Sequence, residues 1–219
     1  METTIVYVTD NVLPLKFAQL VRDKLVEAVR GKPIISVSQK PIELGLNICL
    51  GDIGRSWLSI YKQLNAGLEA VKTPYVAVVE HDCLYTPEHF DFIPPRKDLF
   101  YYNANHWLAQ HTDKLRGMYS YYPRRLAMSQ MICHIDAFSK HVKETLGVLE
   151  EAYKETSTSA RRRKQAELGK DLKADYKYFR TKLPNLDIRH DCNFTGARRG
   201  KKRCYELPYW GKLEEVLKC

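Results

Sequence analysis

The sequence predicts an α/β fold in which a mostly parallel, Rossmann-like sheet is flanked by helices. One observation is that short apolar strands alternate with amphipathic helices near the N-terminus, which is the pattern of parallel βαβ units. A second is that Tyr75–Val79 is an unbroken apolar run, which suits a strand buried on both faces. At 219 residues, the chain has the length of one domain.

The first predicted unit is strand Ile5–Val8, a loop at Thr9–Asp10 and a helix over Pro14–Val29, whose apolar residues follow helical spacing. Ile34–Val37 is the second predicted strand. No G-x-G-x-x-G motif follows the first strand, and this argues against a dinucleotide-dependent oxidoreductase.

A glycine-rich segment, Gly51–Ser56, follows the short strand Ile48–Leu50 and precedes the next helix, for which Ser56 is a candidate N-cap. Glycine lets backbone amides approach an anion closely, and Arg55 adds a planar, permanently charged donor beside the helix N-terminus. Phosphate is the ligand that we expect at Gly54 and Arg55.

Two carboxylates, Glu80 and Asp82, appear where the apolar strand stops. Open α/β sheets bind ligands at the carboxyl ends of their strands. One or two carboxylates can hold Mg²⁺ or Mn²⁺ while the oxygens of a diphosphate complete the coordination shell. The alternative is that these acids only end the strand and face solvent.

These residues carry a family resemblance. Gly54-Arg55-Ser56, a helix containing Gln63, and a valine strand that runs into Glu80-His81-Asp82 resemble family 2-type glycosyltransferases of the GT-A fold. In that family the strand ends in an Asp-X-Asp motif, which holds the metal and the diphosphate of a nucleotide sugar. Glu80 departs from the motif, so Asp82 is the safer ligand. The resemblance covers about the first two thirds of the chain.

The resemblance implies a single GT-A-like domain with a small antiparallel sheet on its acceptor side and a basic C-terminal helix. Residues 1–103 would bind the nucleotide sugar, residues 104–155 would form the acceptor half, and residues 156–219 would add the basic helix, a closing loop and a C-terminal anchor. The implied cofactors are Mn²⁺ or Mg²⁺ and a nucleotide sugar, with a UDP-sugar favoured. Asp82 and Arg55 would act in catalysis, and Asp82, Glu80 and His190 would bind the metal. The implied donor contacts are Thr9, Asp10, Ser36, Gly54, Arg55, Ser56, Gln63, Glu80 and His81.

The middle of the chain predicts the acceptor half. Leu99–Tyr102 reads as a strand, and the following His106 and Trp107 are candidates to flank the acceptor site, with a core position as the alternative for Trp107. Met118–Tyr122 and Leu126–Cys133 predict a hairpin or antiparallel pair.

Asp136 precedes an amphipathic helix, where it is expected as the N-cap, with general base as the alternative. A second long helix is predicted from Arg161 with a narrow apolar stripe: Leu168, Leu172, Phe179 and Leu183. The acids available there as a base are Glu167, Asp171 and Asp175, and the sequence does not choose among them. Leu186–Asp191 alternates like an edge strand, so His190 is either a structural residue or a metal ligand.

Of the net charge of +9, the segment from Arg161 to Arg203 holds 15 basic against 5 acidic residues. Such an excess attracts a polyanion, and a solvated helix face is the alternative. The predicted nucleic-acid contacts are Arg161, Arg162, Arg163, Lys164, Arg198, Arg199, Lys201, Lys202 and Arg203.

The six cysteines include no C-x-x-C pair, and no apolar stretch is long enough to cross a membrane. No signal peptide is recognisable at the N-terminus, so we expect a cytoplasmic protein, in the host cytoplasm if the chain is viral.

The favoured function is transfer of a sugar to a hydroxymethylated pyrimidine in DNA, because a small transferase with a basic segment resembles virus-encoded enzymes of that type, including those of bacteriophages. One alternative is a glycosyltransferase that acts on a cell-surface or lipid-linked glycan. The other is a nucleic-acid-binding α/β protein without catalysis. A nucleotidyltransferase would carry a glycine-rich, lysine-bearing loop after the first strand, and Thr9-Asp10-Asn11-Val12 is not one.

Overall fold

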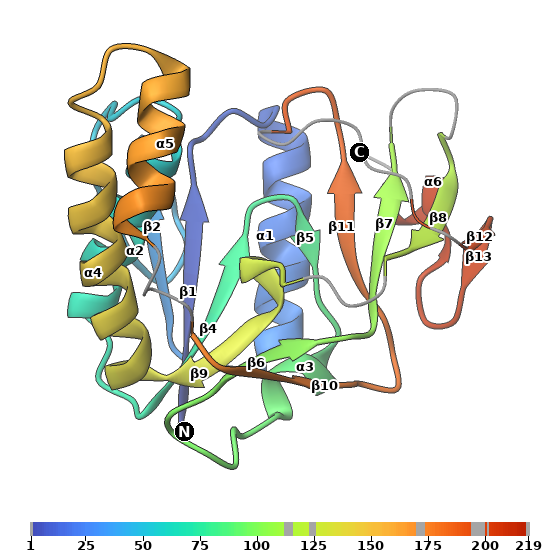
Figure 1. Cartoon of the computed structure of the whole chain (residues 1–219). Helices are drawn as coiled ribbons and strands as arrows, with labels where there is room; N and C mark the ends of the chain where they lie inside the picture. The colour runs from blue at the N-terminus through green and yellow to red at the C-terminus, as the bar shows by residue number, and fades with distance from the viewer. Residues whose placement is uncertain are drawn as a thin grey trace.

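The structure is a computed structural model that describes residues 2–111, 116–122, 126–169, 174–193, 200 and 202–217. Its centre is a seven-stranded sheet with helices on both faces (Figure 1). The strand order is β10, β6, β9, β4, β1, β2, β3, with bounds Tyr176–Phe179, Phe100–Asn103, Met131–His134, Tyr75–Glu80, Thr3–Thr9, Ile34–Ser38 and Leu46–Cys49. The pairing is parallel except at β9, which runs antiparallel to β4 and β6.

Helices cover this sheet because its central strands are apolar on both faces. Ile5 and Tyr7 of β1 pack in the cluster that contains Leu25 of α1 (Leu15–Val29), whereas Val6 and Val8 pack on the opposite face. That opposite face is covered by α2 (Trp57–Glu69) and α4 (Ile135–Ala152), which pack against each other, and α5 (Thr158–Leu168) packs on α4. A short helix, α3 (Pro87–Asp91), contacts α1.

A second sheet of five strands lies beside the first and extends away from α4 and α5 (Figure 1). Its order is β12, β8, β7, β11, β5, with bounds Arg203–Cys204, Met118–Tyr121, His106–Gln110, Asn185–Arg189 and Cys83–Leu84. It packs on the N-terminal half of α1 through Phe17 and Val21 and on α6 through Leu213. The remaining elements are the 3₁₀ turn η2 (Met128–Gln130), β13 (Glu206–Leu207), β14 (Gly211–Lys212) and α6 (Leu213–Val216).

The predicted fold class is confirmed: a mostly parallel sheet is flanked by helices, and a smaller sheet with antiparallel pairs adjoins it. β4 is buried on both faces along Val76–Val79, as its apolar run predicts. Ser56 caps α2, since its side chain accepts a hydrogen bond from the Ser59 amide. The division of the chain at residues 103 and 155 stays a prediction.

Three predictions about elements were wrong. Met118–Tyr122 and Leu126–Cys133 do not pair with each other, because β8 belongs to the small sheet and β9 to the large one. The basic helix ends at Leu168, and Phe179 lies in β10, which pairs with β6. β11 is not an edge strand, because it lies between β7 and β5.

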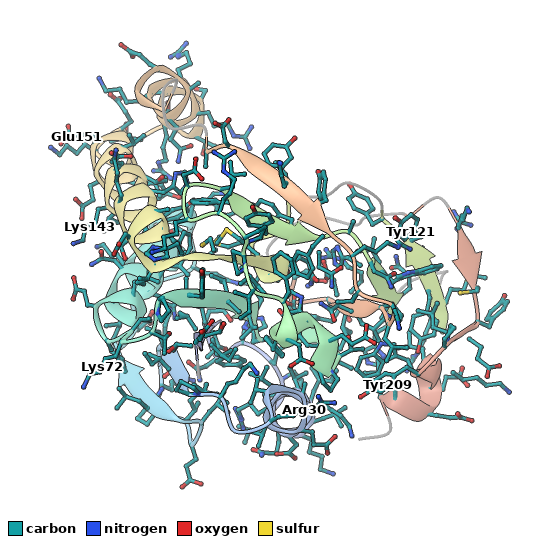
Figure 2. The ribbon with its side chains drawn as sticks, turned by 90° about the horizontal axis from the view of Figure 1, so that it is seen from below. Arg30, Lys72, Tyr121, Lys143, Glu151 and Tyr209 are labelled. Carbon is teal, nitrogen blue, oxygen red and sulfur yellow. The ribbon has the colours of Figure 1, made fainter. Side chains whose placement is uncertain are left out.

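The predicted cap of α4 was also wrong. His134 is the N-cap residue, and its ring Nδ1 accepts a hydrogen bond from the Asp136 amide at 3.3 Å. The Asp136 carboxylate is 89% exposed. The outer face of α4 is charged, and Figure 2 shows Lys143 and Glu151 pointing away from the body of the protein.

Candidate functional site

The carboxyl end of β4 places Asp82 inside the protein. The strand ends at Glu80, the chain turns at His81 and Asp82, and β5 begins at Cys83. Asp82 is 8% exposed, and its Oδ2 accepts a hydrogen bond from Nδ2 of Asn193 at 2.8 Å. The alternative that this acid only ends the strand and faces solvent is therefore wrong.

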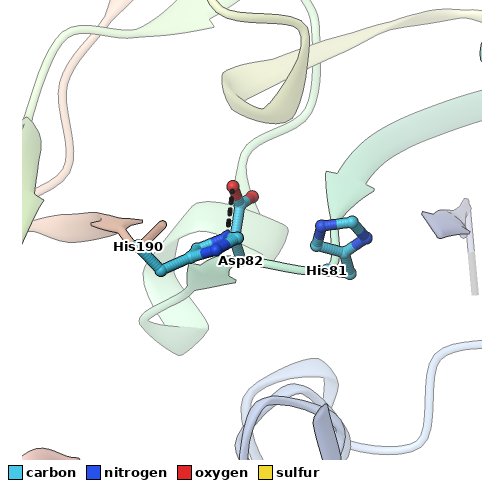
Figure 3. A group of neighbouring side chains, drawn as sticks. All are labelled: His81, Asp82 and His190. Carbon is cyan, nitrogen blue, oxygen red and sulfur yellow. Dashed lines mark ion pairs between the residues drawn. The ribbon is translucent and has the colours of Figure 1, made fainter. Parts of the chain in front are cut away.

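Asp82 belongs to a group of three potential metal ligands with His81 and His190 (Figure 3). One donor atom from each lies within 4.8 Å of the others, and His190 Nε2 is 3.5 Å from Asp82 Oδ2. This His190 nitrogen is buried and lacks a hydrogen-bond partner, so it is available to a ligand. A carboxylate oxygen is the ligand type that suits Mn²⁺, and imidazole nitrogens bind divalent transition metals more generally, so the residues present fit a divalent metal ion. Glu80 forms a second such group with Asp82 and Cys83.

The surroundings of Asp82 keep its carboxylate charged. Burial alone would raise the pKa of Asp82, but the close contact with His190 and the electrostatic effects of His81, His190 and Arg189 outweigh burial and hold that pKa below its usual value. His190 itself is oriented by the main chain, because its Nδ1 accepts a hydrogen bond from the Cys192 amide at 3.2 Å. Metal binding through Nε2 would move the ring proton to Nδ1, at the expense of that hydrogen bond.

Arg55 and Asp10 meet next to the metal group, because Asp10 Oδ1 is 3.5 Å from His81 Nδ1. Arg55 Nε donates to Asp10 Oδ2 at 2.6 Å, and its guanidinium also donates to the main-chain oxygen of Cys192. Gly54 has a φ of +72°, the left-handed region that glycine adopts without strain, and it turns the chain into α2. The structure therefore joins Asp10 and Arg55, which were predicted separately as contacts to the nucleoside and to phosphate.

Three of the predicted donor contacts have clear structural partners. Gln63 donates from Nε2 to the main-chain oxygens of Thr9 and Val37, and it ties α2 to β1 and β2. Thr9 Oγ1 is 3.0 Å from His81 Nδ1, so it positions that ring. Ser36 is fully buried and donates to the Leu44 carbonyl oxygen, and it is not among the residues that line the cavity.

A cavity of about 380 Å³ contains most of the predicted residues. Those that line it are Thr9, Asp10, Gly54, Arg55, Ser56, Gln63, Glu80, His81 and Asp82. His190 is not part of the lining, and it reaches the site through Asp82. The cavity also has residues that sequence reasoning missed: Gln39, Trp57, Tyr61, Asp187 and Arg189. Asn193, the first residue of the predicted closing loop, lines the cavity too.

Asp187 is the most informative of the missed residues. It lies on β11 in the cavity wall and is 5% exposed. Its Oδ1 accepts from Nη1 of Arg189 at 3.3 Å, and its Oδ2 is 3.7 Å from His106 Nε2. The alternation of Leu186-Asp187-Ile188-Arg189 is the available signal, but it predicts an edge strand rather than a cavity wall.

His106 and Trp107, the predicted flanks of the acceptor site, do not line the cavity. His106 is buried beside Asp187. Trp107 packs with the hydrophobic cluster under the small sheet, and its indole Nε1 donates to Asn105 Oδ1. The core alternative therefore describes Trp107.

The acids predicted as candidate bases lie elsewhere. Tyr75, at the start of β4, is paired with His134, at the end of β9. Asp136 follows β9 and therefore lies near the start of β4, whereas Asp82 follows the end of that strand. Glu167 is exposed on α5, and Asp171 is outside the described residues. Asp175 lines a separate groove next to the cavity.

The predicted nucleic-acid contacts that the structure describes lie in two separate places. Arg161–Lys164 lie on α5, where the Arg161 guanidinium stacks over the Tyr153 ring at 4.3 Å. Lys202 and Arg203 lie at β12, and Figure 1 shows α5 and β12 at opposite ends of the molecule. Arg198, Arg199 and Lys201 are outside the described residues.

Within the described residues, the structure has no helix that is both long and apolar enough to span a bilayer.

Comparison of the sequence with protein-family models finds no match, and comparison with curated proteins finds none either. Among solved structures, the chain is similar to a glycosyltransferase involved in the glycosylation of the major capsid of PBCV-1, with 12% identity and a TM-score of 0.48 over 89% of this chain and 95% of that one. It is also similar to the glycosyltransferase GlyE of Streptococcus pneumoniae TIGR4 in its apo form, with 11% identity, a TM-score of 0.45 and coverage of 81% and 45%. A third similar structure is the bifunctional IspDF from Campylobacter jejuni, with 12% identity, a TM-score of 0.45 and coverage of 83% and 50%. The chain thus spans about half the length of these last two proteins.

Proposed function

We propose that the chain is a metal-dependent glycosyltransferase that moves a sugar from a nucleotide-sugar donor to a hydroxyl acceptor. One observation carries this proposal: Asp82, buried at the carboxyl end of β4, lines the same cavity as His81, Arg55 and Asp10. The cavity volume of about 380 Å³ is within the range of small-molecule sites. Trp57, at the mouth of the cavity and 43% exposed, offers a flat face to a nucleobase.

In the proposed reaction, the acceptor oxygen forms a bond to the anomeric carbon of the donor sugar. The bond from that carbon to the diphosphate oxygen breaks, and its electron pair leaves with the nucleoside diphosphate. Mn²⁺ or Mg²⁺, when bound, supplies positive charge that stabilises the leaving diphosphate. Asp82, His81 and His190 would hold the metal, with Glu80 as a further oxygen donor. Arg55, fixed by Asp10, places a second positive charge beside the phosphates.

The proton of the acceptor hydroxyl needs a base, and Asp187 is our candidate. Its carboxylate lines the donor cavity, and Arg189 fixes its orientation through a contact of 3.3 Å. The predicted candidates Asp136 and Glu167 are exposed and do not line the cavity. A positioned carboxylate contributes about 10²-fold or more to such a reaction.

Titration calorimetry with UDP and the other nucleoside diphosphates, with and without Mn²⁺, tests the proposal. We expect binding that requires Mn²⁺ and disappears in Asp82→Asn. Asp136→Asn is the matched control, because this exposed aspartate lies at the other end of β4, and it should bind like wild type. If no nucleoside diphosphate binds, or if Asp82→Asn binds as wild type does, the transferase proposal is wrong. If the protein then binds only polyanions, the non-catalytic nucleic-acid-binding alternative is the better one.

Two acceptors follow from the sequence: a hydroxymethylated pyrimidine in DNA, and a glycan. The prediction of a DNA acceptor combined two basic groups, and Figure 1 shows α5 and β12, which carry their described members, at opposite ends of the molecule. On α5, Arg162 and Arg163 are exposed and support this acceptor. For DNA that contains 5-hydroxymethylcytosine, transfer should weaken steeply with salt, and Arg162→Gln with Arg163→Gln should raise KM without changing donor hydrolysis.

A further inference from the structure

A second groove opens beside the donor cavity, next to β10 at the edge of the large sheet. It has a volume of about 670 Å³, and Tyr176, Asp175 and Lys177 are among the residues that line it. Four residues line both spaces: Phe100, Tyr102, Leu126 and His141. The groove and the cavity are therefore direct neighbours that share part of their walls, so a molecule in the groove lies next to the donor cavity.

The floor of this groove is aromatic. β10 pairs in parallel with β6, which sets Tyr176 beside Phe100 and Tyr178 beside Tyr102. Side chains at alternate positions of a strand share a face, so these four rings lie on one face of the sheet. The Tyr176 ring is 6.1 Å from that of Tyr102 and 5.6 Å from that of Tyr178. Tyr176 is 46% exposed and Tyr178 is 37% exposed, so a ligand has access to them.

The charge of the groove is close to balanced. Asp175 and Lys177 carry opposite charges, and Arg96 Nε is 2.9 Å from Asp98 Oδ1. Burial lowers the pKa of His141, so this ring is neutral at neutral pH. A nucleic-acid backbone requires a row of cations along its path. Among the described residues, none from the basic helix α5 lines the groove or the cavity.

We propose that this groove is the acceptor subsite and that the acceptor is a carbohydrate chain whose sugar rings stack on Tyr102 and Tyr176. The C–H groups on the face of a sugar ring are apolar and pack on an aromatic ring, which buries both surfaces. The hydroxyls at the ring edge need polar partners. The Asp175 carboxylate and the tyrosine hydroxyls provide them. The inference rests on the proposed function, since an acceptor subsite has meaning only beside a donor site.

Binding of the fluorescently labelled protein to an array tests this inference. The array carries defined oligosaccharides and, beside them, single-stranded oligonucleotides with and without 5-hydroxymethylcytosine. We expect wild type to bind a subset of the oligosaccharides, and Tyr176→Ala to lower that signal at least fivefold. Tyr176→Trp should retain it, because a larger aromatic face remains. Tyr205→Ala is the matched control: Tyr205 is 64% exposed and lies between β12 and β13, which Figure 1 shows at the other end of the molecule from α4.

The inference is wrong if wild type binds no oligosaccharide, or if Tyr176→Ala and Tyr205→Ala have equal effects. It is also wrong if Tyr176→Ala abolishes binding to the oligonucleotides instead, because the groove then serves a nucleic acid. Calorimetry with UDP and Mn²⁺ on the same variants separates this inference from the proposed function. Tyr176→Ala should bind UDP like wild type. If this variant loses oligosaccharide binding but still binds UDP, the change affects the groove and leaves the donor site intact.

Discussion

The Oδ2 atom of Asp187 lies 3.7 Å from Nε2 of His106, and the two residues come from the neighbouring parallel strands β11 and β7. Both are buried, but only Asp187 lines the donor cavity. The other carboxylate oxygen, Oδ1, accepts a hydrogen bond from Arg189. These two contacts fix the orientation of Asp187 in the cavity wall. A fixed carboxylate beside a candidate metal group is an arrangement that suits an inverting sugar transfer, in which a base takes the proton of the acceptor hydroxyl.

Asp187→Asn should lower the rate of UDP release from UDP-sugars by about a hundredfold or more, because the amide cannot accept the proton of the hydroxyl or water that attacks the sugar. The Kd for UDP with Mn²⁺ should change less than about twofold, since the metal group is intact. Asp136→Asn is again the control and should have wild-type turnover. Equal losses of turnover and UDP affinity in Asp187→Asn would assign this residue to donor binding instead.

Arg55→Gln should weaken UDP binding in the presence of Mn²⁺ by about tenfold, which corresponds to about 1.4 kcal/mol. The guanidinium lies in the cavity wall and is held by Asp10, so its charge is already in position for a diphosphate. Arg30→Gln is a suitable control, because Arg30 is exposed and pairs with Asp91 on the outer surface. Calorimetry measures the affinities, and thermal unfolding shows whether the variants are folded.

The Asp10→Asn variant distinguishes two roles of the Arg55–Asp10 pair: a purely structural one, and one that positions Arg55 for phosphate. If the Arg55–Asp10 pair only joins the loop after β1 to the start of α2, both variants should lose the same stability and keep UDP affinity. If the pair prepares Arg55 for phosphate, Asp10→Asn should keep much of the stability and lose less affinity than Arg55→Gln.

The sequence was sufficient for the part of the site that depends on local patterns. Tyr75–Val79 is apolar at every position, which predicts a strand buried on both faces. Asp82 comes directly after this strand in the sequence, so its place at the carboxyl end of the strand is predicted as well. Gly54 and Ser56 gave the turn and the cap of α2 for similar reasons. These features depend on residues close together in the chain, and their outcomes agree with the structure.

Asp187 could not be found in the same way. Leu186-Asp187-Ile188-Arg189 has the alternation of an edge strand, and only the pairing of β11 with β7 and β5 buries both of its faces. That pairing joins segments about 80 to 100 residues apart in the chain, which no local pattern specifies. Phe179 similarly fits a helical stripe, yet the parallel pairing of β10 with β6 takes it into the sheet.

The stability of the protein should depend on pH through His89. This ring is fully buried among Tyr85, Phe90 and Phe179, and its Nε2 has no hydrogen-bond partner. Burial, assisted by the positive charge of His106, lowers the pKa of His89 to about 3. The unfolded chain keeps a histidine pKa of about 6.5 and therefore binds a proton that the folded state excludes between these two values. The contribution of His89 to stability is thus complete above about pH 6.5 and is lost as the pH falls below it.

Because the pKa of His89 is lower in the folded than in the unfolded chain, the free energy of unfolding should fall by about 2 kcal/mol between about pH 7 and pH 5. His89→Phe should remove that part of the pH dependence, because phenylalanine fits an aromatic site and carries no titratable nitrogen. Urea unfolding of wild type and variant at both pH values measures the difference. Phe90→Leu is the control, since Phe90 is also fully buried and the variant should lose the same stability at both pH values. A pH dependence in His89→Phe equal to that of wild type would show that other groups account for the acid sensitivity, and that His89 binds protons equally in the folded and the unfolded chain over this range.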